Sequence, residues 1–148
     1  MLKIAIGSDH AGFQLKEAIK KYLKELGYDY EDFGTDSEEP VNYPDFAAEV
    51  ARVVNKNVCS KGILICGSGI GMSIVANKFP GVRAALYYDV TSAKLSREHN
   101  DANILTIGAR MVDKKKAKEI VKAWLTTEFA GGRHKKRIDK IKEIEKEL

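Results

Sequence analysis

Short apolar runs alternate with stretches of helical periodicity along the whole chain, and this alternation limits the possible folds more than any other feature. The runs that predict strands are residues 3–7, 28–34, 62–66, 83–88 and 103–108. Between and after them, helices are predicted over residues 13–26, 44–54, about 71–79, 92–100, about 114–124 and 137–148, where apolar side chains recur every three or four positions. Strands that alternate with helices form a parallel sheet covered on both faces. We therefore predict a single α/β domain over residues 1–148, a three-layer Rossmann-like fold with a five-stranded parallel sheet and a C-terminal helix.

The composition and the cysteine count exclude several classes of protein. With 148 residues, 44% hydrophobic and 31% charged, the chain fits a globular protein with a substantial core. The apolar runs fall well short of the roughly 20 residues that a membrane helix requires, so we expect a cytoplasmic protein without a membrane segment. Two cysteines, Cys59 and Cys66, are too few for a disulfide framework, and no zinc-ligand spacing is present. We expect no metal and no cofactor.

Polar residues and glycines gather where the predicted strands end. Asp9 and His10 follow the first strand, Cys66 ends the third, and Gly108–Arg110 follow the fifth. In open parallel sheets, ligands bind beyond the carboxyl ends of the strands. We therefore expect a ligand site at this edge of the sheet.

The loop after the third predicted strand reads Gly67-Ser68-Gly69-Ile70-Gly71. Glycines allow backbone N–H groups to approach a ligand closely, and a following helix start adds partial positive charge. The spacing matches neither the dinucleotide motif GxGxxG nor a P-loop, which argues against a nucleotide. The loop therefore predicts a set of N–H donors for a small anion, or for an oxyanion that forms during a reaction.

Cys66 lies directly before this loop and has two interpretations. A free cysteine at the end of a core strand is often a small buried apolar residue. The alternative is a thiol whose pKa is lowered by the adjoining helix start, which would act as a nucleophile or a general base. Cys59 lies in a polar stretch without such a setting, and we interpret it as structural.

Histidines and arginines supply the remaining candidates. His10 and His99 flank predicted element ends, where a histidine is either structural or catalytic. Arg110, Arg133 and Arg137 are candidates for bidentate phosphate contacts, and the last two share a helical face. The basic cluster around Arg133 fits an anionic small-molecule site, a nucleic-acid patch or a solvated helix face.

Taken together, these residues resemble the type B ribose-5-phosphate isomerases, a family that also contains galactose-6-phosphate and allose-6-phosphate isomerases. The resemblance covers nearly the whole chain and rests on five segments in order: GSDHAGF, NYPDF, GILICGSGIGMSIVANK, SAKLSREHNDANILTIGAR and GGRHKKRI. It implies interconversion of ribose 5-phosphate and ribulose 5-phosphate through an enediolate, as in the pentose phosphate pathway.

The resemblance also implies a role for individual residues. Cys66 would be the general base, Ser68 would help to move a proton between the enediolate oxygens, and His99 would be the acid that opens the furanose ring. The substrate would be bound by Asp9, His10, Tyr43, Gly67, Ser68, Gly69, Ile70, Gly71, Asn100, Arg110, Arg133 and Arg137. Members of the family pair so that each site takes residues from two chains, which implies a homodimer or a dimer of dimers. The role of His134, between two of the arginines, stays open.

Two other functions remain as alternatives. The first is an isomerase of a six-carbon sugar phosphate, such as allose or galactose 6-phosphate. The second is a non-catalytic sugar-phosphate sensor or a nucleic-acid binder, which would need neither Cys66 nor His99. We expect a small phosphosugar as the ligand, and neither nucleic acid nor membrane as a partner.

Overall fold

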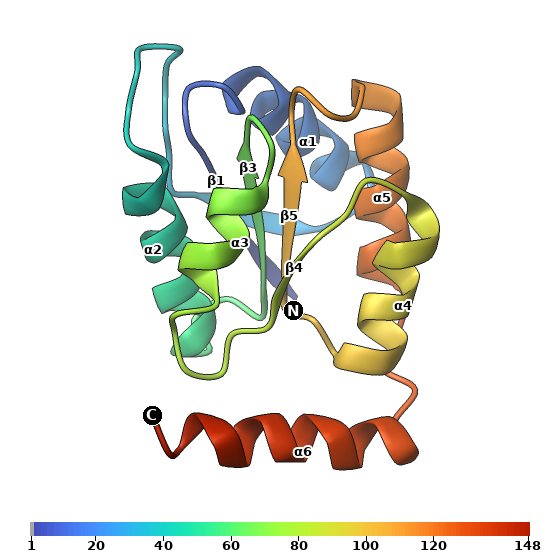
Figure 1. The fold of residues 1–148 in the computed structure, drawn as a ribbon. Helices are drawn as coiled ribbons and strands as arrows, with labels where there is room; N and C mark the ends of the chain where they lie inside the picture. Colours follow the sequence, from blue (N-terminus) through green and yellow to red (C-terminus); the bar gives the residue numbers. More distant parts are fainter. Residues whose placement is uncertain (1) are drawn as a thin grey trace.

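The apolar runs form five parallel strands between two layers of helices in the computed structural model, which describes residues 2–148 (Figure 1). The strands are β1 (Lys3–Ser8), β2 (Asp29–Asp32), β3 (Lys61–Cys66), β4 (Ala84–Leu86) and β5 (Ile104–Gly108). Their order in the sheet is β2-β1-β3-β5-β4, and every neighbouring pair is parallel. The predicted three-layer α/β fold is therefore confirmed.

Within residues 2–148, six helices cover the sheet and one of its ends. They are α1 (Phe13–Glu25), α2 (Tyr43–Asn55), α3 (Ile70–Ala76), α4 (Val90–Asn100), α5 (Lys114–Thr126) and α6 (Arg133–Glu145). Helices α2 and α3 pack on one face, while α1, α4 and α5 pack on the other (Figure 1). No helix of residues 2–148 has the length and apolar character that crossing a membrane demands.

The central strand β3 shows how the two faces are built. Ile63 and Ile65 point into the core shared with α1 and α5, whereas Leu64 and Cys66 point into the core shared with α2 and α3. Successive side chains of a strand point to opposite faces, so a strand covered on both sides is apolar at nearly every position. Cys66 therefore ends β3 on the α2–α3 face, next to the start of α3.

Most element boundaries follow the local signals in the sequence. Gly27 ends α1 with φ of +86°, as its position predicted. Asp113 caps α5, because its side-chain oxygen accepts a hydrogen bond from the Lys116 N–H at 2.7 Å. Strands β2 and β4 are shorter than the apolar runs that predicted them, since only their central residues pair with the sheet.

Helix α6 begins at Arg133, four residues before the predicted start at 137. Gly131 and Gly132 both have positive φ, and the helix forms immediately after this turn. Figure 1 shows α6 lying across the end of the sheet that is opposite to the tip of β3. Ile138, only 3% exposed, anchors it, and the Ala130 N–H donates to the Glu98 carbonyl at 3.0 Å.

Candidate active site

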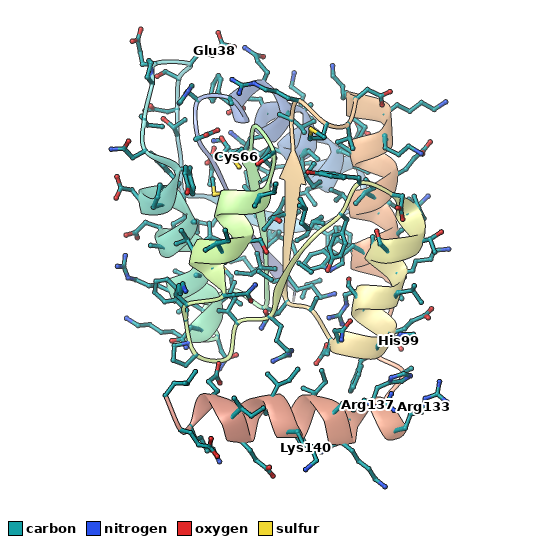
Figure 2. All side chains as sticks on the ribbon, viewed as in Figure 1. Glu38, Cys66, His99, Arg133, Arg137 and Lys140 are labelled. Atoms are coloured by element: carbon teal, nitrogen blue, oxygen red, sulfur yellow. The ribbon has the colours of Figure 1, made fainter. Side chains whose placement is uncertain are left out.

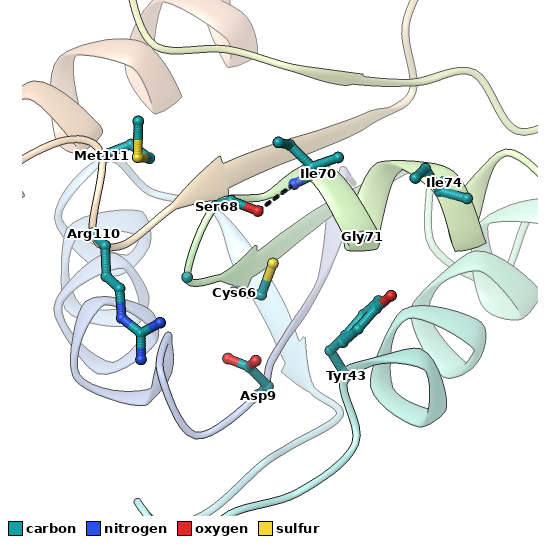
Figure 3. A pocket seen from close by; sticks show the side chains of 10 residues that line it. Asp9, Tyr43, Cys66, Ser68, Ile70, Gly71, Ile74, Arg110 and Met111 are labelled. Carbon is teal, nitrogen blue, oxygen red and sulfur yellow. Dashed lines mark hydrogen bonds between the residues drawn. The ribbon is translucent and has the colours of Figure 1, made fainter.

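A cavity of about 550 Å³ opens at the carboxyl ends of the strands, as the sequence predicted for a ligand site (Figure 3). Its walls come from the ends of β1, β3 and β5 and from the first turns of α2 and α3. The residues that line it are Asp9, Tyr43, Cys66, Gly67, Ser68, Ile70, Gly71, Ile74, Arg110 and Met111.

The Cys66 side chain is 5% exposed and forms part of this wall. Its Sγ accepts a hydrogen bond from the Gly69 N–H at 3.1 Å. The sulfur therefore lies at the cavity wall with a backbone N–H directed at it. Of the two interpretations of Cys66, the placement at a cavity wall facing an amide favours the reactive thiol over a purely apolar core residue.

The glycine loop turns tightly over the neighbouring strands. Gly69 has φ of +82°, and a Cβ there would lie 2.5 Å from Leu86 Cδ1, so the backbone approaches β4 closely. Two residues further along the chain from Leu86, the Tyr88 hydroxyl donates to the Ser68 carbonyl at 2.9 Å. Two neighbours therefore fix the path of the loop.

Two of the loop's five N–H groups already have a side-chain acceptor. The Gly69 N–H donates to the sulfur of Cys66, and the Ile70 N–H donates to Ser68 Oγ at 3.2 Å (Figure 3). Gly71 lies in the first turn of α3, where N–H groups lack partners within the helix. Within residues 2–148, no acceptor is recorded for the N–H groups of Gly67 and Ser68. Gly67, Ser68 and Gly71 thus remain to bind an oxyanion.

Charged and aromatic side chains complete the rim. The Arg110 guanidinium lies over the loop, since a Cβ at Gly67 would be 3.1 Å from its Nη1. Asp9 is 7% exposed, and its carboxylate accepts the Gly12 N–H at 3.1 Å. The Tyr43 ring lies against Gly71, in space that a Cβ at that position would fill.

His10 lies beside the cavity rather than among the residues that line it. Its Nδ1 accepts a hydrogen bond from the Val41 N–H at 3.1 Å, which assigns the ring proton of the neutral form to Nε2. A second bond joins Gln14 to Glu38 at 2.8 Å. His10 therefore anchors the loop 36–42, which leads into α2 and Tyr43.

The other predicted site residues lie at the opposite end of the molecule. His99 and Asn100 end α4, which runs back from the carboxyl edge of the sheet, and Arg133 and Arg137 are exposed on α6. Figure 2 shows Cys66 near one end of the sheet and His99, Arg133 and Arg137 near the other. A single chain therefore separates the predicted residues into two groups.

Within this second group, two imidazole rings are stacked. The ring centroids of His99 and His134 lie 4.2 Å apart, and the ring planes differ by 15°. Desolvation lowers the pKa of His134, and the nearby charges of His99, Arg133 and Arg137 lower it further. The sequence alone gave no sign of this contact.

The cavity also contains residues that sequence reasoning missed. Ile74 and Met111 line it together with Ile70, and these three side chains are 57%, 55% and 51% exposed. Ile74 lies one turn beyond Ile70 on α3, within the segment 62–78 that carries the resemblance, and Met111 directly follows Arg110, so helical spacing and adjacency could have pointed to both. Large exposed apolar side chains around a cavity are typical of a surface that another molecule covers.

A thiol, a row of amide donors and an arginine thus surround one cavity. Among residues 2–148, no group of three or more His, Cys, Asp or Glu side chains is placed to hold a metal ion. A base next to donors that face a developing oxyanion is what proton abstraction beside a carbonyl requires. The fold and the cavity together define an α/β protein suited to acid–base chemistry on a small anionic ligand.

Comparison with the sequences of known proteins shows to which family this α/β protein belongs. The sequence profile of the ribose/galactose isomerase family matches residues 4–141, so the chain belongs to that family. Ribose-5-phosphate isomerase B of Escherichia coli is 49% identical over 145 residues, covering 98% of this chain and 97% of that protein.

Solved structures of ribose-5-phosphate isomerases B have the same fold as this chain. Ribose-5-phosphate isomerase B of Clostridium thermocellum has a TM-score of 0.97 at 53% identity, covering 99% of both chains. The enzyme of Mycoplasma genitalium with bound ribulose-5-phosphate has a TM-score of 0.95 at 43% identity, covering 99% of this chain and 98% of that one.

Proposed function

We propose that the chain interconverts ribose 5-phosphate and ribulose 5-phosphate, with Cys66 as the base that moves the proton. The observation that carries this proposal is the Cys66 sulfur at the cavity wall, bonded to the Gly69 N–H at 3.1 Å and adjoining the remaining amides of the loop. The relative from Mycoplasma genitalium, whose structure contains ribulose-5-phosphate, supports this substrate.

The cavity's geometry supports the following course of proton transfer. In the open-chain aldose, the Cys66 thiolate removes the proton from C2, and the electron pair passes through the C1 carbonyl to give an enediolate. The N–H groups of Gly67, Ser68 and Gly71 stabilise the negative oxygen. The Ser68 hydroxyl transfers a proton between the two oxygens, and the thiol of Cys66 returns its proton to C1 to complete the ketose.

Ring opening and phosphate binding require residues that this cavity lacks. We infer that a second copy of the chain supplies His99, Asn100, Arg133 and Arg137, while Arg110 comes from the same chain as Cys66. The phosphate group of ribose 5-phosphate is a dianion. A guanidinium group can donate two parallel hydrogen bonds to two oxygens of one phosphate. The exposed apolar rim of the cavity, with Ile70 at 51%, fits burial by that second copy.

Mixed dimers test this assembly. Cys66→Ala and His99→Ala chains are each expected to be inactive, but a dimer of one of each contains one site with both residues intact. Random mixing then restores about a quarter of the wild-type activity, since half of the dimers are mixed and each has one working site of two. Inactive mixtures whose mixed dimers are verified by mass would refute the shared site.

The substrate is tested by comparing kcat/KM for ribose 5-phosphate and allose 6-phosphate with the wild-type chain. We expect the five-carbon sugar to be preferred at least about tenfold, equivalent to about 1.4 kcal/mol of transition-state binding. A preference for the six-carbon sugar would support the alternative isomerase. Because phosphorylated sugars do not cross membranes unaided, we infer that the enzyme acts in the cytoplasm, within pentose phosphate metabolism.

A further inference from the structure

We propose that His134 is a positioning residue for His99: its imidazole stacks on the His99 ring and holds it in the orientation needed to donate a proton to the furanose ring oxygen. The inference rests on the proposed function, because it assigns His134 a part in the ring-opening step. It concerns a contact within one chain and does not depend on where the second copy lies.

The geometry limits how the His99 ring can turn. The centroids are 4.2 Å apart with only 15° between the planes, so rotation about χ2 of His99 would drive its edge into His134. His99 is half-buried in the last turn of α4, where the helix itself places few restraints on a side-chain ring. The stack therefore supplies an orientation that α4 alone does not provide.

Helix α6 is fixed on α4 at this point, so the stack is not a chance contact between mobile side chains. The Ala130 N–H donates to the Glu98 carbonyl at 3.0 Å, directly before α6 begins. One turn after His134, Ile138 is 3% exposed and packs inward. Figure 2 shows His99 beside the segment that carries Arg133 and Arg137.

The surroundings of His134 favour its neutral form. His99 and Glu98 face His134 from α4, and Arg133 and Arg137 face it from α6. Desolvation and the three positive neighbours lower the pKa of His134, while Glu98 opposes this shift. His134 is therefore mainly neutral at pH 7 and presents an uncharged aromatic face to the His99 ring.

Ring opening is a balanced proton transfer that needs this control. The bond between C1 and the ring oxygen breaks, that oxygen takes a proton from His99, and the C1 hydroxyl gives its proton to a solvent water molecule as C1 becomes the aldehyde. A proton donor must lie within hydrogen-bond distance and in line with its acceptor. Misplacement of a catalytic group by about 1 Å can slow a reaction by up to about a hundredfold.

Two other roles for His134 predict different results. If it assisted Arg133 and Arg137 in binding phosphate, its loss would raise KM. If it only packed α6 onto α4, its loss would lower thermal stability and leave catalysis intact. The experiment must therefore separate ring opening from phosphate binding and from folding.

Three variants and two reactions make this separation. His134→Ala removes the aromatic face, and His134→Phe keeps a flat ring without the imidazole nitrogens. Lys136→Ala changes an exposed neighbour on the same helix and is the matched control. The first reaction is isomerisation of ribose 5-phosphate, which begins with a closed ring. The second is deuterium incorporation from D₂O at C1 of ribulose 5-phosphate, an open-chain ketose, which needs the Cys66 proton transfer but no ring opening.

We expect His134→Ala to lower kcat for ribose 5-phosphate by about tenfold or more, with KM and the deuterium exchange within about twofold of wild type. His134→Phe should recover most of kcat, and Lys136→Ala should match wild type. A raised KM with unchanged kcat would overturn the proposal in favour of phosphate binding. An equal loss in both reactions, or no change in either, would also overturn it.

The experiment distinguishes a failure of the proposed isomerase function from a failure of the positioning role of His134. A wild-type chain that does not isomerise ribose 5-phosphate would refute the proposed function, whatever the variants do. Wild-type activity with a silent His134→Ala would refute only the positioning role. The thermal midpoints of all variants identify any that fail to fold. If His134→Ala is one of them, His134→Phe, which preserves the packing volume, is compared with wild type in both reactions instead.

Discussion

Replacing Gly69 with alanine tests whether the backbone of the glycine loop is fixed as the cavity requires. The residue has φ of +82°, a conformation that costs a residue with a Cβ roughly 1–2 kcal/mol. The new Cβ would also lie 2.5 Å from Leu86 Cδ1 and 2.8 Å from the Ile107 carbonyl carbon. Overpacking of this kind adds about 1–3 kcal/mol, so we expect Gly69→Ala to lower the free energy of unfolding by about 2–5 kcal/mol.

Gly27→Ala is the matched control. Gly27 has a similar φ of +86°, but nothing lies within 4 Å of the Cβ it would gain. The free energy of unfolding of this variant should therefore fall only by the roughly 1–2 kcal/mol that the backbone conformation costs. Urea denaturation at one fixed protein concentration measures both variants, because an oligomer's stability depends on concentration. Gly69→Ala should also lose turnover, since its N–H donates to the Cys66 sulfur. Equal destabilisation by the two variants would refute the close approach.

Three further predictions concern charged and polar contacts. Arg110→Lys should raise KM for ribose 5-phosphate about tenfold with little change in the thermal midpoint, because lysine cannot bind phosphate in bidentate fashion; an unchanged KM would contradict this. His10→Ala should speed amide hydrogen exchange in the loop 36–42, because the Val41 N–H loses its acceptor. His10→Asn retains an acceptor and should speed the exchange less. Equal exchange rates in the two variants would contradict the role of His10 in holding this loop. Burial raises the pKa of Asp32, but bonds from the fully buried Lys16 (2.6 Å) and from Lys20 lower it overall, so ionised Asp32 stabilises the fold at neutral pH. Asp32→Asn should thus lower the free energy of unfolding by about 2–4 kcal/mol at pH 7, and this difference should shrink as the pH falls below about 4; a difference that persists in acid would contradict it.

The fold could be predicted because its determinants are local. Strands such as β3 are apolar at nearly every position, and helices begin and end at recognisable residues such as Asp113 and Gly27. The start of α6 was placed four residues late because residues 133–136 are all polar or charged and give no apolar periodicity. There, the turn at Gly131 and Gly132 sets the helix start.

The candidate site was predictable only in part. The position of Cys66 before a glycine loop, at the carboxyl edge of a parallel sheet, follows from chain order and topology. The same topology separates His99 from Cys66, because a helix between two parallel strands runs back toward their amino ends; only the family resemblance had grouped the two residues (Figure 2). The stack of His99 on His134 joins residues 35 positions apart and leaves no periodic trace.

The structure also shows a second reason for glycine at position 71. The sequence suggested that Gly67, Gly69 and Gly71 serve to expose backbone N–H groups. Gly71 additionally leaves room for the Tyr43 ring, which a Cβ would displace from the cavity wall. Such a contact between α3 and the first residue of α2 depends on the packing of the two helices, which no local pattern encodes.

Turnover and binding of ribose 5-phosphate by Cys66→Ala test the central claim, that this sulfur carries the proton. The account predicts that kcat falls by about a hundredfold to ten-thousandfold, as removal of a general base does, while the dissociation constant measured by calorimetry stays within about threefold of wild type. A Cys66→Ala chain that isomerises the sugar at nearly the wild-type rate would contradict the account.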